Sequence, residues 1–201
     1  IGAINGNNEL LPEASKGVVL NARLLWTFSS SYRLLSKPND LKMAHRAYQY
    51  FKDYFVDKVY GGVYWELDYK GNPKNTRKQI YGLSFAIYGL VEYYRICEND
   101  EALQLAIALY GLIETKSFDV KNNGYVEALS REWKHMDDYR LSEKDANESK
   151  TMNTHLHILE AYTNLYRVWK DENLAKALKN LIELFIDKFI NSNYNLNLFL
   201  N

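Results

Sequence analysis

The sequence has only one cysteine, Cys97, in 201 residues, so a framework of internal disulfides is excluded. It has no surplus of either charge, because 25 Lys and Arg residues balance 25 Asp and Glu residues. A chain without a basic surplus has no general electrostatic attraction to nucleic acid or to an anionic membrane surface. It also lacks an apolar run of the roughly 18 residues that a membrane span requires. We therefore expect a soluble, cytoplasmic protein with no nucleic-acid or membrane partner.

Metal-ligand spacing is absent too, although two of the four histidines lie close together in "TMNTHLHILEAY" (151–162). Helical zinc sites use ligands four residues apart on one face. A helix advances about 100° per residue, so His155 and His157 point to different sides. Asn153, His157 and Glu160 instead share one face. We expect no protein-bound metal, and either both histidines are core residues with satisfied hydrogen bonds or one of the two faces a site.

Apolar residues make up 47% of the chain, enough for one sizeable domain with a substantial core. Aromatic residues are also plentiful, at 14%. Aromatic rings fill helical interfaces, and they also stack against the C–H faces of sugars. Composition alone favours packing.

A repeat of about sixty residues organises the chain. "DKVYGGVYWELD" (57–68) and "DVKNNGYVEAL" (119–129) each combine glycine with alternating apolar and polar residues, which predicts a short strand. A weaker copy, "DKFINSNYNLNLFL", covers 187–200. We expect short strands only near 62–68 and 124–129.

The segments between these loops predict helices in pairs. The first member of each pair is apolar on nearly every side, as expected for a helix buried all round: 17–35, 77–96 and 153–169. The second member is amphipathic, which predicts an outer helix. Repeated inner and outer helices build either an open solenoid or a closed α/α barrel. Units of about sixty residues favour the barrel, and three pairs make half of one with six pairs.

The repeat also suggests a functional site. Arg23, Tyr81 and Asn153 lie 39, 43 and 41 residues before the landmarks Gly62, Gly124 and Tyr194. We therefore expect these side chains at roughly equivalent positions on three inner helices, converging at one level near the axis. Buried polar groups need partners, which a ligand or a structural hydrogen-bond network supplies equally well.

Four motifs carry a resemblance to a known family. "LNARLLWTFS" (20–29), "GGVYWELD" (61–68), "TRKQIYGLSFAIYGLVEYYR" (76–95) and "MNTHLHILEAYT" (152–163) resemble, in order and spacing, the cellobiose 2-epimerases of the N-acylglucosamine 2-epimerase superfamily. The resemblance implies an all-α (α/α)6 barrel with short β-hairpin loops. Residues 1–201 would form part of this single catalytic domain and would lack its C-terminal half.

The resemblance also assigns residues. His157 would be catalytic, and the substrate-binding residues would be Arg23, Trp26, Trp65, Tyr81, Asn153 and Glu160. Two further histidines, which the family uses as the acid/base pair at C2, belong to the missing half of the barrel.

The implied reaction needs no metal or cofactor, and it is epimerisation at C2 of the reducing-end sugar of a β-1,4-linked disaccharide, cellobiose to 4-O-β-glucosylmannose. An imidazole removes the C2 proton, a cis-enediolate forms, and a second imidazole returns a proton to the other face. Histidine suits this chemistry because its pKa lies close to neutral pH.

Other functions also fit the sequence. The chain could be a relative that acts as an N-acylglucosamine 2-epimerase or a mannose isomerase. An (α/α)6 glycosidase would need two carboxylates, for which Asp137 and Asp138 are the candidates. A non-catalytic carbohydrate-binding module would use Trp26 and Trp65 without turnover.

Overall fold

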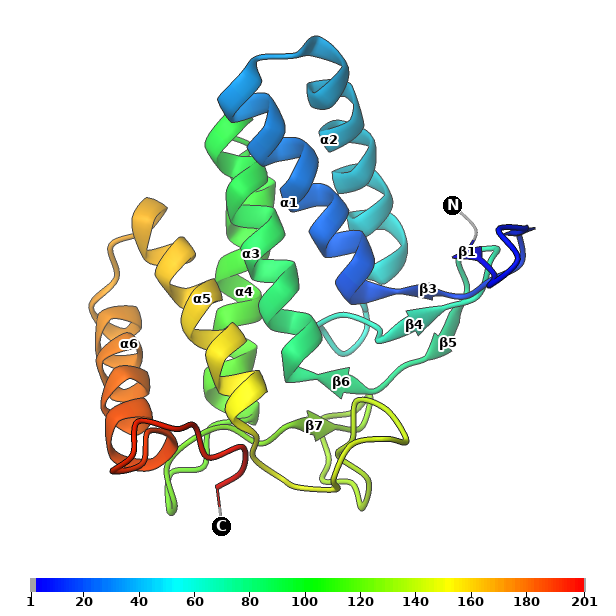
Figure 1. Ribbon diagram of the computed structural model, residues 1–201. Helices are drawn as coiled ribbons and strands as arrows, with labels where there is room; N and C mark the ends of the chain where they lie inside the picture. Colours follow the sequence, from blue (N-terminus) through cyan, green and yellow to red (C-terminus); the bar gives the residue numbers. More distant parts are fainter. Residues whose placement is uncertain (1–2, 201) are drawn as a thin grey trace.

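The computed structural model describes residues 3–200, which are dominated by three consecutive helix pairs (Figure 1). The inner helices are α1 (Val18–Leu35), α3 (Ile80–Cys97) and α5 (Met152–Val168). The outer helices are α2 (Pro38–Tyr50), α4 (Asp100–Lys116) and α6 (Glu172–Leu184). Wider turns extend α2 and α6: η1 (Phe51–Phe55) and η2 (Phe185–Phe189). The predicted three inner and three outer helices are confirmed.

Local sequence sets the helix ends. Asn99 and Asp171 begin the outer helices α4 and α6, where their side chains accept hydrogen bonds from backbone N–H groups of the first turn. Proline at the first position begins α2, where its missing N–H costs nothing. Inner helices α1 and α3 end at Ser36 and Glu98, both in the left-handed conformation that closes a helix.

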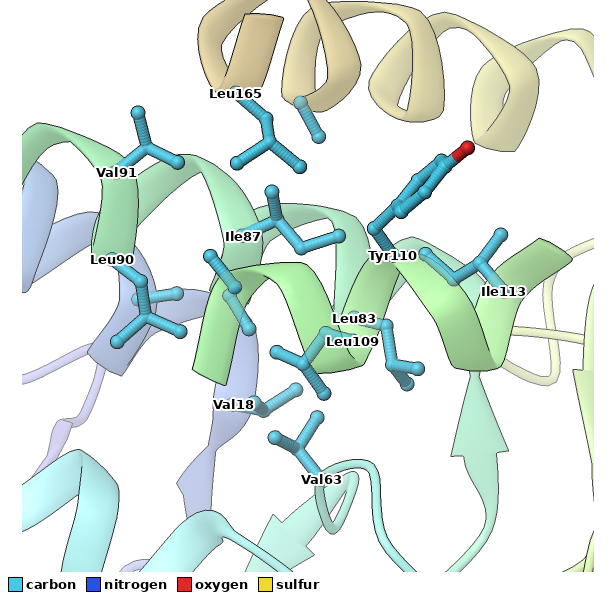
Figure 2. Packing of buried hydrophobic residues seen from close by; sticks show 14 of the residues in the cluster. Val18, Val63, Leu83, Ile87, Leu90, Val91, Leu109, Tyr110, Ile113 and Leu165 are labelled. Atoms are coloured by element: carbon cyan, nitrogen blue, oxygen red, sulfur yellow. The ribbon is translucent and has the colours of Figure 1, made fainter. Parts of the chain in front are cut away.

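Helix α3 lies between α1 and α5, and each outer helix packs against the inner helix that precedes it: α2 against α1, α4 against α3 and α6 against α5 (Figure 1). Glycine allows the close approach of α1 and α3, because a Cβ at Gly89 would lie 2.7 Å from the carbonyl oxygen of Ala22. The apolar core gathers around α3 and includes Leu83, Ile87 and Leu90 (Figure 2). No helix within residues 3–200 is long and apolar enough to cross a membrane.

The prediction that every inner helix is buried all round holds only for α3. Helix α1 exposes Leu20, Leu34 and Leu35, whose relative exposures are 57%, 68% and 59%. The reason is position, because α3 has an inner helix on each side whereas α1 and α5 lie at the two ends of the row.

Strands form beside the N-terminal ends of the inner helices and pair antiparallel (Figure 1). Two lie where predicted, β4 (Glu66–Leu67) and β7 (Ala128–Leu129). The expectation of strands only there is wrong, because five more form: β1 (Ala3–Ile4), β2 (Leu10–Leu11), β3 (Lys16–Gly17), β5 (Pro73–Asn75) and β6 (Lys78–Gln79). Strands need partners for their backbone groups, and the extended residues just before α1 and α3 supply them: β3 pairs with β4, and β6 pairs with β7.

The same ion pair recurs between successive repeats. Lys78 lies two residues before α3 and bonds to Asp57 at 2.8 Å, and Lys150 lies two residues before α5 and bonds to Asp119 at 2.7 Å. Each pair ties the loop after an outer helix to the start of the next inner helix. These links set the positions at which α3 and α5 begin.

Candidate active site

The three inner helices begin in the same register. The first helical N–H of each donates to a loop carbonyl: Val18 to Trp65 at 3.0 Å, Ile80 to Glu127 at 3.0 Å, and Met152 to Leu198 at 2.8 Å. Residues at the same distance from these starts are therefore equivalent.

Six of the seven candidate site residues lie on one equivalent face of the inner helices. The second, sixth and ninth helical positions share a face. In α1, α3 and α5 respectively, the second position holds Val19, Tyr81 and Asn153. The sixth position holds Arg23, Phe85 and His157, and the ninth holds Trp26, Tyr88 and Glu160. The sequence-predicted residues thus line one surface across three helices.

The expectation that Arg23 lies level with Tyr81 and Asn153 is wrong. Tyr81 and Asn153 are both second in their helices, whereas Arg23 is sixth, one turn further along. The distances of these residues from the loop landmarks differ by up to four residues, and four residues are about one full helical turn. The equivalents of Arg23 are Phe85 and His157.

His157 is half-buried, and its ring packs against two aromatic rings, those of Tyr81 and Phe85. Its ring centroid lies 4.8 Å from that of Tyr81, at an interplanar angle of 84°, and 4.6 Å from that of Phe85. Its Nδ1 is 2.7 Å from Glu160 Oε2. A carboxylate only accepts, so Nδ1 carries the proton and donates, and Nε2 is the nitrogen that can meet a ligand.

His155 is fully buried on a different side of α5, as the helical spacing predicted. Its Nδ1 donates to the carbonyl of Thr151 at 2.6 Å, and its Nε2 accepts from the backbone N–H of Tyr125 at 2.9 Å. Burial lowers its pKa to about 4, so the ring is neutral at physiological pH. Nε2 therefore holds the loop after α4, and Nδ1 bonds to the residue that caps α5 itself.

The Tyr81 phenol is half-buried and lies in the field of both charges of the site. Burial raises its pKa above the usual value, while the positive charge of Arg23 opposes the rise and Glu160 adds to it. The phenol therefore keeps its proton at neutral pH and can donate a hydrogen bond.

Trp26 and Glu160 line a hollow further along the inner helices. Its volume is about 340 Å³, and its wall also includes Tyr88 and Asn164. The Trp26 ring stacks on that of Tyr88, with centroids 5.4 Å apart and planes inclined by 12°. Trp65 lies apart from this wall, in the loop before β4, where it packs beside Gly82 at the start of α3.

Sequence reasoning missed Glu127. Its carboxylate is buried and accepts hydrogen bonds from the hydroxyls of Thr151, at 2.9 Å, and Thr154. Burial raises its pKa to about 7, although the hydrogen bonds from Thr154 and Thr151 act to lower it. No sequence signal marks it, because alignment of the loops on Gly62, Gly124 and Tyr194 sets Glu127 opposite Trp65 and the polar Asn197, whereas the loop carbonyls show that its equivalents are Trp65 and Leu198.

Asp137 and Asp138 do not form a pair of opposed carboxylates. Asp137 is exposed, and Asp138 accepts from its neighbour Arg140 at 2.9 Å. That hydrogen bond lowers the pKa of Asp138, whereas a general acid needs a raised one. The geometry gives the glycosidase alternative no support.

The chain is similar to known proteins over nearly its whole length. Residues 1–197 match the family model of N-acylglucosamine 2-epimerase (GlcNAc 2-epimerase). A cellobiose 2-epimerase of Bacteroides fragilis is 58% identical over 189 residues, which are 94% of this chain and 48% of that protein. One of Ruminococcus albus is 42% identical over 178 residues, covering 89% of this chain and 45% of the relative. The chain thus spans about half the length of the curated relatives it matches.

A solved structure shows the same arrangement of helices. The cellobiose 2-epimerase from Bacillus thermoamylovorans B4167 superposes with a TM-score of 0.95 at 44% identity, covering 100% of this chain and 52% of that one. The helix pairs described above are therefore half of an (α/α)6 barrel, as predicted. The chain belongs to the N-acylglucosamine 2-epimerase family.

Proposed function

We propose that this chain forms the substrate-holding half of a carbohydrate 2-epimerase that converts cellobiose to 4-O-β-glucosylmannose. The observation that carries the proposal is the shared face of Arg23, Tyr81, Asn153 and His157, in a chain 58% identical to a cellobiose 2-epimerase. Arginine, phenol, amide and imidazole groups are the donors that an enediolate intermediate requires.

The chemistry passes through the open-chain sugar. Removal of the C2 proton beside the C1 aldehyde leaves negative charge on oxygen, and preorganised donors stabilise such charge by about 3 kcal/mol each. Arg23 supplies a fixed positive charge and Tyr81 a phenolic proton. The acid/base pair that moves the proton between the two faces of C2 comes from the other half of the ring.

His157 acts on this oxygen through Nε2. Glu160 holds Nδ1–H at 2.7 Å, and its negative charge stabilises the imidazolium that forms when Nε2 takes up a proton. In ring opening, Nε2 takes the proton of the C1 hydroxyl while solvent protonates the ring oxygen, and in the next step the imidazolium returns its proton to the C1 oxygen of the enediolate. Asn153, one turn earlier on the same face, adds an amide donor.

Two tryptophans supply apolar surface for the sugar rings. Trp26 and Tyr88, whose rings stack on each other, both line the hollow beside Glu160. We assign Trp65, in the loop before β4, to the second sugar unit of a disaccharide. Aromatic faces pack well against the C–H groups of pyranose rings.

Residues 1–201 would be part of one barrel domain whose remaining pairs close the ring. The third residue of α3, Gly82, packs against Val18 of the preceding inner helix, whereas its equivalent in α1, Leu20, is 57% exposed. A further inner helix beside α1 would cover Leu20.

For the experiments, we call residues 1–201 joined to a second half of the ring the completed barrel. That second half is taken either from the same protein or from the Bacteroides fragilis relative. A cytoplasmic location agrees with the single cysteine.

The test is a substrate panel with the completed barrel. Incubation with cellobiose, N-acetylglucosamine or mannose, followed by NMR of the anomeric protons, should show glucosylmannose from cellobiose at a kcat/KM at least tenfold above that of either monosaccharide. Preferred turnover of N-acetylglucosamine or mannose would assign the chain to another branch of the family. Absence of turnover with all three would contradict the proposed function.

A further inference from the structure

Glu127 joins the first turns of α3 and α5. Its backbone carbonyl accepts from the N–H of Ile80 at 3.0 Å, and its carboxylate accepts from the hydroxyls of Thr151 and Thr154. Ile80 directly precedes Tyr81, and Thr151 and Thr154 flank the turn that carries Asn153. One residue therefore contacts both helices that bring Tyr81 together with His157.

The repeat shows that the fold does not require a carboxylate at this position. The equivalents of Glu127 are Trp65 and Leu198, and their carbonyls make the same bond to the first residue of the inner helix that belongs to the same repeat. Trp65 packs beside Gly82, the third residue of α3, and Glu127 meets Thr154, the third residue of α5. The carboxylate and its hydroxyl partner occur only before α5, the helix that carries His157.

Keeping a carboxylate there is costly. The side chain is buried, its partners are neutral hydroxyls, and burial raises its pKa. An apolar side chain of similar size, such as the other repeats have, avoids that cost. A costly buried polar group is typical of a functional site, where it fixes geometry.

The hydroxyls of Thr151 and Thr154 both donate to the Glu127 carboxylate, and these bonds fix the start of α5. The Thr151 hydroxyl donates to Glu127 and, with its lone pair, accepts from the backbone N–H of Thr154 at 3.1 Å, so it caps the helix. Thr154 donates to the other carboxylate oxygen. The first turn of α5 is thereby held from two sides against the loop that begins α3.

We infer that Glu127 is a positioning residue of the epimerase site, which holds the Asn153 and His157 side chains of α5 at a fixed distance from Tyr81 of α3. This inference rests on the proposed function. Glu127 acts through Thr151 and Thr154, and it makes no contact with the sugar.

A pair of matched variants of the completed barrel tests the inference. Glu127→Gln keeps the shape of the side chain, but one of its two terminal atoms becomes a donating nitrogen. The variant therefore cannot accept a hydrogen bond from Thr151 on one terminal atom and from Thr154 on the other. Glu114→Gln is the control, because Glu114 is also a carboxylate that accepts from two hydroxyls, those of Tyr125 at 2.8 Å and Tyr162 at 2.7 Å, and burial also raises its pKa. Glu114 lies on the outer helix α4.

Glu127→Gln should lower kcat on cellobiose at least tenfold with KM changed less than threefold, because displacement of catalytic groups affects the chemical step most. Glu114→Gln should leave both constants within twofold of wild type. Thr154→Val should reproduce the loss in kcat, and the double variant with Glu127→Gln should be no slower than the slower single variant. A kcat for Glu127→Gln within twofold of wild type, or losses that multiply in the double variant, would overturn the inference.

A second readout separates this inference from the proposed function. In protein labelled with ¹⁵N-histidine, Glu127→Gln should shift the ring resonances of His157, while Glu114→Gln should leave them in place. This holds whether or not the wild type turns over cellobiose, so an inactive wild type would overturn the proposed function alone. An unmoved His157 signal in Glu127→Gln would overturn the inference alone.

Discussion

The rings of His157 and Tyr81 meet edge to face, with 4.8 Å between their centroids and 84° between their planes. The two residues belong to different helix pairs and are 76 positions apart in the sequence. Their contact depends on α3 and α5 beginning in register, which the loop carbonyls and the Asp–Lys ion pairs enforce. The site is thus a direct product of the repeat.

The two neighbouring histidines should differ sharply in their effect on stability. His155→Ala removes the acceptor of the Tyr125 N–H and opens a cavity beside Phe189, so it should lower the free energy of unfolding by roughly 3 kcal/mol. His157→Ala, at a half-buried position where Nδ1 donates to the exposed Glu160, should cost clearly less, about 1 kcal/mol. Urea unfolding of both variants of the completed barrel measures the difference, and equal losses would contradict the assignment of faces.

Stability should respond to pH through two buried groups with opposite signs. Burial lowers the pKa of His155 from 6.5 to about 4, so the unfolded chain binds more protons in that window and stability is lost as pH falls from 6.5 to 4. Burial raises the pKa of Glu127 from 4.5 to about 7, so the folded chain binds more protons and stability is lost as pH rises from 4.5 to 7.

The two effects nearly cancel between pH 4.5 and 6.5, and Glu127→Gln should reveal the effect of His155. The free energy of unfolding of this variant should fall more steeply than that of wild type as pH is lowered through this window, by about 1.4 kcal/mol per pH unit. Urea titrations at pH 4.5, 5.5 and 6.5 provide the comparison. Parallel profiles for variant and wild type would mean that Glu127 does not titrate in this range.

The repeated ion pairs provide a matched stability test. Asp57 and Lys78 are both fully buried, and although burial raises the pKa of Asp57, hydrogen bonds from Arg131 and Lys78 outweigh that effect and hold it below its usual range. Asp57→Asn leaves a buried ammonium without its counter-charge and should cost roughly 3–5 kcal/mol.

Asp119→Asn, at the equivalent place in the next repeat, should cost clearly less. Lys150 is 9% exposed and keeps its bond to the carbonyl of Asn123 at 2.6 Å. Thermal unfolding of the two variants side by side is the measurement, and a larger loss for Asp119→Asn would show that burial does not set the strength of these links.

Much of this arrangement could be predicted from sequence. Helix pairs, their order and the separation of His155 from His157 follow from local periodicity, which one sequence displays directly. The level of Arg23 could not be predicted, because its register depends on which loop carbonyl begins each helix, a contact between distant residues. Glu127 was missed for the same reason, since within "GYVEAL" it looks like one residue of a solvated strand until α5 packs over it.

Residues 1–201 expressed alone should self-associate. Helix α1 exposes Leu20, Leu34 and Leu35, and the segment at the other end of the row exposes Ile182 and Ile186. Apolar patches beyond a few hundred Å² favour association. Sedimentation velocity should show dimers or larger species, and the completed barrel, which covers these faces, should remain closer to a single species. A stable monomer of 1–201 would show that the exposed faces are not barrel contacts.

Deuterium exchange at C2 measures whether the two halves of the barrel divide the chemistry between them. Cellobiose is incubated in D₂O with the completed barrel, with its His157→Ala variant, and with residues 1–201 alone, and NMR follows deuterium at C2 of the reducing-end sugar. We expect incorporation by the completed barrel together with formation of 4-O-β-glucosylmannose, a loss of at least a hundredfold in His157→Ala, and only the buffer rate for 1–201. Unchanged incorporation in His157→Ala, or incorporation by 1–201 well above the buffer rate, would contradict this division.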